Sequence, residues 1–198
     1  MQSTLPIRLD APQTLSELRR TFAGKMLLSV SATAFVALCA HVSLPLYFTP
    51  VPLTLQTFAV ILVGLTLGPA LGFSAMVLYL AEGAIGLPVF SPHGPGGVAQ
   101  LIGPTAGYLY SYPLAAAIAG GVVRAFRSSR FAIAAAAGGT VAASIAIFAM
   151  GAAWIAHLLH LSPATAWHVA IAPFLPGEIV KIAAVLTAYT SLRRWVRS

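Results

Sequence analysis

The chain has 198 residues, of which 59% are hydrophobic and only 8% are charged. A soluble domain carries about 25% charged residues, so this composition excludes an ordinary soluble domain and indicates an integral membrane protein. The formal net charge of +7 would suit a nucleic-acid-binding protein. The basic residues instead form short clusters at the ends of apolar runs, without aromatic side chains that could stack on bases, which argues against that class.

Residues 1–24 are polar and charged, and we expect them to form a cytoplasmic lead-in. Within them, the sequence Thr-Leu-Ser-Glu at 14–17 has the pattern of a capping box and predicts a short interfacial helix. A cleaved signal peptide is the alternative, because residues 32–40 are rich in small side chains. The long basic lead and the apolar runs that follow favour the uncleaved lead-in.

Long uncharged runs follow along the rest of the chain. A helix needs about 20 residues to cross a bilayer, so the second run, residues 53–81, is too long for one crossing. The sequence Gly-Pro-Ala-Leu-Gly at 68–72 predicts a tight turn that divides it into two short helices. The sequence therefore predicts an all-α membrane domain of six helices over residues 25–193, with a cytoplasmic tail at 194–198. The uncharged runs are residues 26–43, 53–81, 101–123, 131–156 and 171–180.

Basic residues outside these helices predict the orientation of the chain. Of the 11 Lys and Arg residues, four precede the first helix, three lie between the fourth and fifth helices, and three follow the sixth. The positive-inside rule then places both termini and the connection between the fourth and fifth helices in the cytoplasm. That arrangement requires an even number of crossings, which six helices satisfy.

Two opposite charges, Glu178 and Lys181, lie inside the last apolar stretch. An ionised side chain within a bilayer is costly unless it is paired or hydrated, so such residues mark a ligand site, a relay or a pathway. Their i, i+3 spacing puts both on one helix face. Pro173 and Pro176 predict that a helix begins or kinks just before Glu178, where the helix dipole favours a carboxylate. A structural ion pair that fixes the helix register is the alternative.

Two connections rich in Pro or Gly are predicted on the outer side, above this pair. Residues 45–52, the first outer loop, contain three prolines, and we expect a stiff, extended lid. Residues 86–97, the second outer loop, are rich in glycine, whose backbone N–H groups can form an anion-binding nest at Gly96 and Gly97. We expect an outward pocket floored by Glu178 and Lys181 under both loops. For the second outer loop, a flexible surface connection is the alternative.

Four motifs occur in order along the chain: TPVPLTLQT at 49–57, GAIGLPVF at 83–90, GPTAGY at 103–108 and PFLPGEIVK at 173–181. With these motifs, the region from about Lys25 to Tyr189 resembles the BioY family of biotin transporters. Members of this family are the substrate-binding S-components of energy-coupling-factor (ECF) transporters. Many of them have Asp where Glu178 stands. The resemblance implies a multi-pass protein of the bacterial inner membrane that imports biotin and is not an enzyme.

The resemblance also implies roles for particular side chains. Glu178 would accept hydrogen bonds from the urea N–H groups of biotin, and Lys181 would donate to the urea carbonyl. The carboxylate tail would suit Gly96 and Gly97. The alternative for the aromatic candidates is core packing or an interfacial belt, and for Glu82 an interfacial carboxylate. The further candidates for substrate contact are Gln56, Tyr79, Glu82, Phe90 and Tyr108.

Energy for import would have to come from other subunits, because the sequence contains no G-x-x-x-x-G-K-[ST] loop for ATP. The resemblance implies a transmembrane coupling subunit and a pair of cytoplasmic ATPases, although some members of the family work without them. Ser29, Thr33 and Ala37 form a stripe of small residues that predicts a docking surface for the coupling subunit. Packing of this stripe within the chain's own bundle is the alternative. We expect no cofactor other than the transported biotin.

Two other classes of function deserve comparison. A metal site would draw on His157, His160 and His168, but these lie near the predicted outer boundary with no carboxylate close by in sequence, so we expect no metal site. A carrier for another small vitamin, or a solitary proton-coupled carrier that uses Glu178 and Lys181, stays open.

Overall fold

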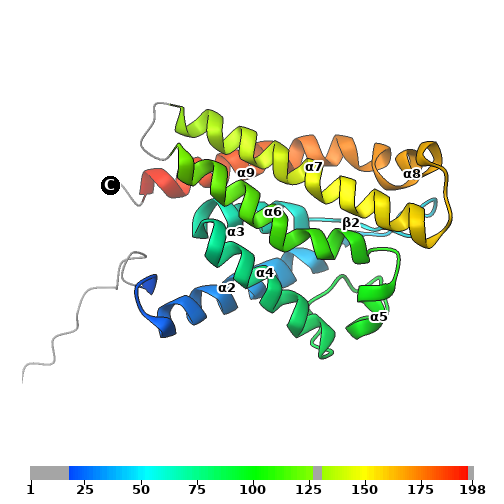
Figure 1. Cartoon of the computed structure of the whole chain (residues 1–198), viewed down its shortest axis with the longest axis horizontal. Coiled ribbons are helices and arrows are strands. Elements are labelled where there is room, and N and C mark those ends of the chain that lie inside the picture. The colour runs from blue at the N-terminus through cyan, green and yellow to red at the C-terminus, as the bar shows by residue number, and fades with distance from the viewer. Residues whose placement is uncertain (1–17, 127–130, 196–198) are drawn as a thin grey trace, which may run out of the picture.

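Helices make up nearly all the regular structure of the computed structural model, which describes residues 18–126 and 131–195 (Figure 1). One antiparallel ribbon, in which β1 (Ser43–Leu44) pairs with β2 (Leu53–Thr54), departs from the predicted all-α fold and closes the first outer loop. The helices, in chain order, are α2 (Phe22–His41), α3 (Gln56–Leu67), α4 (Pro69–Ala84), α5 (Gly97–Ile102), α6 (Ala106–Ala125), α7 (Ala132–Leu158), α8 (Pro163–Ala170), the 3-10 turn η1 (Ala172–Phe174) and α9 (Leu175–Trp195).

Several of these helices are long and apolar enough to cross a bilayer. In the described part of the chain they are the 20-residue helices α2 and α6, the 27-residue α7, and the stretch Pro163–Arg194 that includes α9. Helices α3 and α4 are apolar but shorter, with 12 and 16 residues. This composition and these lengths describe a helical membrane protein.

The break between α3 and α4 lies where the sequence predicts it. Gly68 adopts φ +84°, a conformation that favours glycine, and its N–H donates to the Gly64 carbonyl at 2.9 Å. Pro69 then occupies the first turn of α4, where its missing N–H costs no helical hydrogen bond. Two residues therefore end one helix and start the next.

Helix α6 packs against α3, α4 and α7, and glycines allow its close approach to them. A Cβ on Gly64 of α3 would lie 2.4 Å from the carbonyl oxygen of Ala116 in α6. A Cβ on Gly107 of α6 would lie 2.3 Å from the Cβ of Trp154 in α7. Backbones that approach this closely place the side chains of three helices around one shared space, where the site described below is found.

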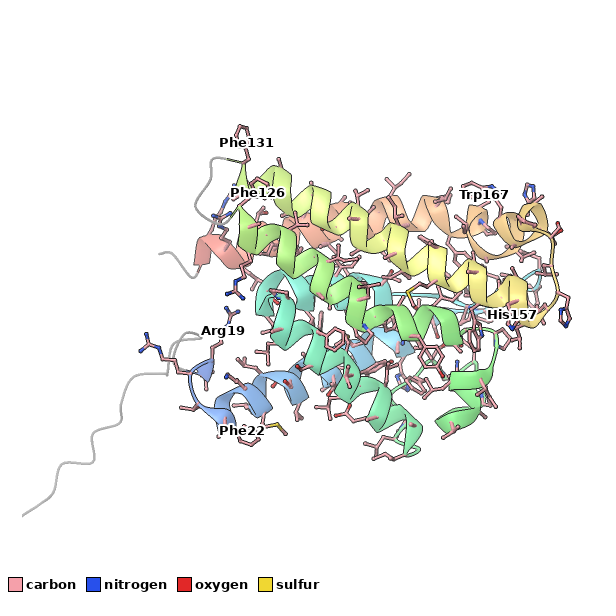
Figure 2. The ribbon with its side chains drawn as sticks, viewed as in Figure 1. Arg19, Phe22, Phe126, Phe131, His157 and Trp167 are labelled. Atoms are coloured by element: carbon pink, nitrogen blue, oxygen red, sulfur yellow. The ribbon has the colours of Figure 1, made fainter. Side chains whose placement is uncertain are left out.

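The ends of the helices divide between two ends of the bundle. Figure 2 shows Arg19 and Phe22 at one end together with Phe126 and Phe131, which flank the connection from α6 to α7. The end of α9 lies at this end as well, whereas α5 and α8 lie at the opposite end (Figure 1). Both ends of the described chain and the residues that flank the α6 to α7 connection thus share one end, as the positive-inside argument requires.

Two sequence expectations are corrected by the structure, and one falls outside it. Helices α5 and α8 were not predicted, and they cap the end of the bundle opposite the termini. The predicted capping box at residues 14–17 lies outside the described residues.

The stripe of small residues on α2 corrects the second expectation, because it packs within the chain. Ser29 is 6% exposed and Thr33 is 2% exposed, and Thr33 Oγ1 donates to Glu82 Oε1 on α4 at 3.1 Å. Ala37 is partly buried against the hydrophobic core. Other parts of the chain cover Ser29 and Thr33, so only Ala37 of the stripe keeps part of its surface exposed.

Candidate functional site

The two predicted intramembrane charges form a buried ion pair at the start of α9. Lys181 Nζ lies 2.8 Å from Glu178 Oε2, and the two residues are 7% and 4% exposed. Glu178 lies in the first turn of α9, where free backbone N–H groups and the positive end of the helix dipole stabilise a carboxylate. The i, i+3 spacing therefore places both side chains on one face of α9, as the sequence predicts.

Hydroxyl groups from neighbouring helices complete this pair. Thr57 in α3 accepts a hydrogen bond from Lys181 Nζ at 2.7 Å and donates to Glu178 Oε2 at 3.3 Å. Lys181 also donates to the Thr54 carbonyl at 3.3 Å, and Ser144 in α7 donates to Glu178 Oε1 at 2.7 Å. The three ammonium protons and both carboxylate oxygens thus have partners, and the pair ties α9 to α3 and α7.

A cavity opens beside Lys181 and encloses about 550 Å³, counting the space at its open mouth. The enclosed part that compares with small-molecule sites is about 50 Å³, below their usual range of about 300–1,000 Å³. Its lining joins an apolar wall to a polar one, with Lys181 as the charged residue. The apolar wall comprises Val51, Pro52, Leu53, Tyr108, Leu109, Tyr112, Phe148 and Phe174, and the polar wall Thr54, Gln56, Thr57, Ser91, Gln100, Thr105 and Lys181.

A second cavity adjoins the first on the side of the outer loops. It shares Pro52, Gln100 and Thr105 with the first cavity. Its other lining residues come from the two outer loops and the segment before α6: Pro50, His93, Gly94, Pro95, Gly103 and Pro104. Both outer loops therefore contribute to the walls above Lys181.

The model of the BioY family matches residues 11–198 of this chain. The chain belongs to the BioY family. Among curated proteins, it is 39% identical over 137 residues to the "Probable biotin transporter BioY" of Pyrococcus horikoshii, covering 68% of this chain and 75% of that one. It is 38% identical over 164 residues to the "Biotin transporter BioY" of Rhodobacter capsulatus, covering 79% of this chain and 85% of that one.

A solved structure shares the fold of this BioY chain. It is described as the crystal structure of the S-component for biotin from an ECF-type ABC transporter, and it superposes with a TM-score of 0.76. The superposition covers 93% of this chain and 95% of the other at 24% sequence identity. At this identity the likeness establishes the fold.

Among the candidate residues of this BioY chain, Lys181, Gln56 and Tyr108 line the first cavity. The Tyr108 hydroxyl donates to the Ala170 carbonyl at 2.6 Å, so its phenol group is already bonded and the residue offers its ring to the cavity. The Gln56 amide is held by Tyr112, whose hydroxyl donates to Gln56 Oε1 at 3.4 Å. These three candidates therefore line the first cavity, and their contact with substrate stays a prediction.

Tyr79 and Phe90 lie behind the cavity wall. Gln56 Nε2 donates to the Tyr79 hydroxyl at 2.7 Å, and that hydroxyl donates to the Val89 carbonyl at 2.7 Å. Phe90 packs edge-on against Tyr79, with ring centroids 5.5 Å apart. Both aromatics are therefore packed in the core, which is the alternative given for them above. Through these contacts they hold Gln56 and the second outer loop.

The remaining candidates do not line either cavity. Glu178 lies behind Lys181, and Glu82 accepts its hydrogen bond from Thr33. Gly96 and Gly97 adopt the expected positive φ values of 68° and 58°, but the Gly96 N–H donates to Gln100 Oε1 at 3.3 Å. The predicted carboxylate nest is thus engaged by the protein itself and lies outside both linings.

Six polar residues of the site were not predicted: Thr54, Thr57, Ser91, Gln100, Thr105 and Ser144. Thr57 lies within the TPVPLTLQT motif, which is the sequence signal that could have identified it. Ser144 lies among alanines of α7 and carries no such signal. Within residues 18–126 and 131–195, no three His, Cys, Asp or Glu side chains lie close enough together to hold a metal ion.

Proposed function

We propose that this chain is the substrate-binding subunit of a biotin transporter and captures biotin in the cavity beside Lys181. Membership of the BioY family and the names of the curated relatives support a transport protein rather than an enzyme. The observation that carries the proposal is a cavity beside Lys181 whose lining combines polar side chains with apolar ones. Biotin has the matching division into a polar urea ring and an apolar thioether ring with an alkyl chain.

The charged wall suits the urea ring of biotin. Lys181 is a donor for the urea carbonyl, and its long 3.3 Å bond to the Thr54 carbonyl is the one that a ligand replaces most easily. The two urea N–H groups need acceptors, of which Gln56 Oε1 lies in the cavity lining, whereas Glu178 lies behind Lys181. In this arrangement Glu178 also keeps Lys181 charged and oriented.

The apolar wall suits the thioether ring and the alkyl chain. Tyr108 presents its ring, and Phe148 lies edge-on to it, with ring centroids 6.5 Å apart. Phe174 packs next to Phe148 at 6.4 Å and extends the wall toward α9. Burial of apolar ligand surface against such side chains stabilises the complex by about 25 cal/mol for each Å² removed from water.

The proposal includes the setting of the subunit in the membrane. We assign six crossings, with α3 and α4 as the two short ones, cytoplasmic termini, and a cavity that opens outward under both outer loops. Import would be driven by a transmembrane coupling subunit and cytoplasmic ATPases, as the description of the structural neighbour as part of an ECF-type transporter suggests. The membrane is the bacterial inner membrane.

Titration of the purified, detergent-solubilised chain with biotin tests this function. We expect saturable binding of one biotin per chain, with no competition from thiamine or riboflavin at equal concentration. Competition by another vitamin would assign the site to that substrate class. Absence of biotin binding by a chain that unfolds cooperatively on heating would contradict the proposal.

A further inference from the structure

Ser91 places an unpartnered hydroxyl group in the wall of the first cavity. The residue is 7% exposed, and its Oγ atom is buried without a hydrogen-bond partner among residues 18–126 and 131–195. Buried polar groups in folded proteins are nearly always hydrogen-bonded, so an unsatisfied one requires an explanation. Because Ser91 lines the cavity, a bound ligand can supply the missing partner.

The position of Ser91 is fixed by its surroundings. The preceding residue, Phe90, is buried against Tyr79, whose hydroxyl donates to the Val89 carbonyl at 2.7 Å. On the other side, the Gly94 N–H donates to the Ser91 carbonyl at 3.3 Å. The backbone at Ser91 is thus held in place before any ligand arrives, which lowers the entropy lost on binding.

Ser91 belongs to the loop side of the cavity. It lies on the second outer loop. Gln100 holds the same loop by accepting from the Gly96 N–H, and it donates to Thr105 Oγ1 at 2.7 Å. Gln100 and Thr105 line both cavities, so their part of the wall faces the second cavity. Lys181 and Thr57, in contrast, belong to the helices. The polar side chains of the lining therefore include some from the long helices, such as Lys181 and Thr57, and one from the second outer loop, Ser91.

We propose that Ser91 Oγ donates a hydrogen bond to the carboxylate of the bound substrate. This inference rests on the proposed function, in which the urea ring occupies the helix side at Lys181 and the carboxylate tail points toward the outer loops. A hydroxyl donor suits a carboxylate because the charged acceptor strengthens the bond. Ser91 replaces Gly96 and Gly97 in this role, since those glycines lie outside both linings.

The test compares Ser91→Ala with a matched control, Ser43→Ala. Ser43 in β1 also has a buried Oγ without a partner in the described part of the chain, but it lines neither cavity. Biotin affinity and the thermal midpoint of the ligand-free chain are measured for both variants and the wild type. The same titrations use an analogue of biotin in which a methyl group replaces the carboxylate.

For Ser91→Ala we expect biotin affinity to fall about 10-fold, as is typical for loss of one hydrogen bond to a charged group. We expect its ligand-free midpoint to be unchanged or higher, because no bond within the protein is lost. Ser43→Ala should bind biotin like the wild type. The methyl analogue should bind wild type and Ser91→Ala equally, since it carries no acceptor for the hydroxyl.

Other results overturn the inference. Wild-type biotin affinity in Ser91→Ala would show that the hydroxyl does not contact the substrate. An equal loss for biotin and the methyl analogue would show that it contacts a different part of the substrate. A lowered ligand-free midpoint with unchanged affinity would assign Ser91 a structural role. Failure of the wild type to bind biotin at all would overturn the proposed function and this inference together.

Discussion

Lys181 takes part in the structure and in the cavity at once. Its ammonium group bonds to Glu178, Thr57 and the Thr54 carbonyl, and the residue also lines the space where a ligand can lie. A charge in an apolar bundle needs such partners in the ligand-free state, because an unpaired buried ion is strongly destabilising. The structural and ligand-binding interpretations of the pair are therefore complementary, and variants can separate their contributions.

We expect Lys181→Ala to weaken biotin binding by one to two orders of magnitude, since a hydrogen bond from a charged donor contributes about 1.5–3 kcal/mol. The same variant leaves the Glu178 carboxylate buried without its counter-ion, and the bundle should lose about 3–5 kcal/mol of stability. The double variant Glu178→Gln, Lys181→Met should recover most of this stability, because both charges are removed together. Titration with biotin and thermal unfolding in detergent measure the two effects.

The double variant serves as the control for misfolding. If it unfolds at a temperature near that of the wild type yet fails to bind biotin, the loss belongs to the site. Normal biotin binding by the double variant would contradict a ligand-binding role for the pair and leave only its structural role.

The residues of the site differ in how far sequence can identify them. Glu178 and Lys181 are apparent because charges are rare in apolar helices. Thr57 and Ser144 are not, because hydroxyl groups are common in membrane helices and their partner here is more than 30 residues away along the chain. The predicted glycine nest shows a related limit: the positive φ of Gly96 follows from its residue type, but the bond of its N–H to Gln100 depends on the folded loop.

At the scale of the elements, adjacent glycines in α6 differ in what they contact. A Cβ on Gly120 would lie 2.5 Å from the Gly64 carbonyl oxygen and 2.6 Å from the Pro69 nitrogen, all backbone atoms at the α3 to α4 turn. A Cβ on Gly121 would meet nothing within 4 Å. The packing of α6 against that turn thus depends on one of the two glycines.

We expect Gly120→Ala to lower the thermal midpoint of the detergent-solubilised chain, because overpacking against backbone typically costs about 1–3 kcal/mol. Gly121→Ala, the matched control one residue away, should leave the midpoint unchanged or raise it, since alanine favours a helix by up to about 1 kcal/mol over glycine. Equal effects of the two substitutions would contradict the close contact of α6 with the turn.

The long helices and the break at Gly68 follow from sequence because each has a local cause: an apolar run, or a Gly-Pro pair that ends one helix and starts another. Helix α5 has six residues within a loop rich in glycine, too few to show a periodic pattern. The β1 to β2 ribbon has two residues in each strand and forms only when the first outer loop folds back. Burial of the stripe on α2 likewise depends on which helices surround it.

At the scale of the whole molecule, the distribution of basic residues and the arrangement of the helices agree. Arg19 and the residues that flank the α6 to α7 connection, Phe126 and Phe131, lie at one end of the bundle, and His157 and Trp167 lie at the other (Figure 2). His93 lines the second cavity, to which both outer loops contribute. These loops lie at the same end of the bundle as α5 (Figure 1). Orientation of the chain therefore decides whether substrate enters from outside the cell.

Reporters of membrane sidedness test this orientation. A reporter fused after Arg127 or after Ser198 should be active in the cytoplasm, because basic residues concentrate near both positions and cytoplasmic connections retain them. A reporter inserted at His93 should be active outside, and one inserted at His160, in the connection from α7 to α8, provides a second outer position from a different part of the chain. His93 and His160 reporters on opposite sides would contradict the six crossings, whereas a cytoplasmic His93 would place the cavity mouth on the wrong side for uptake.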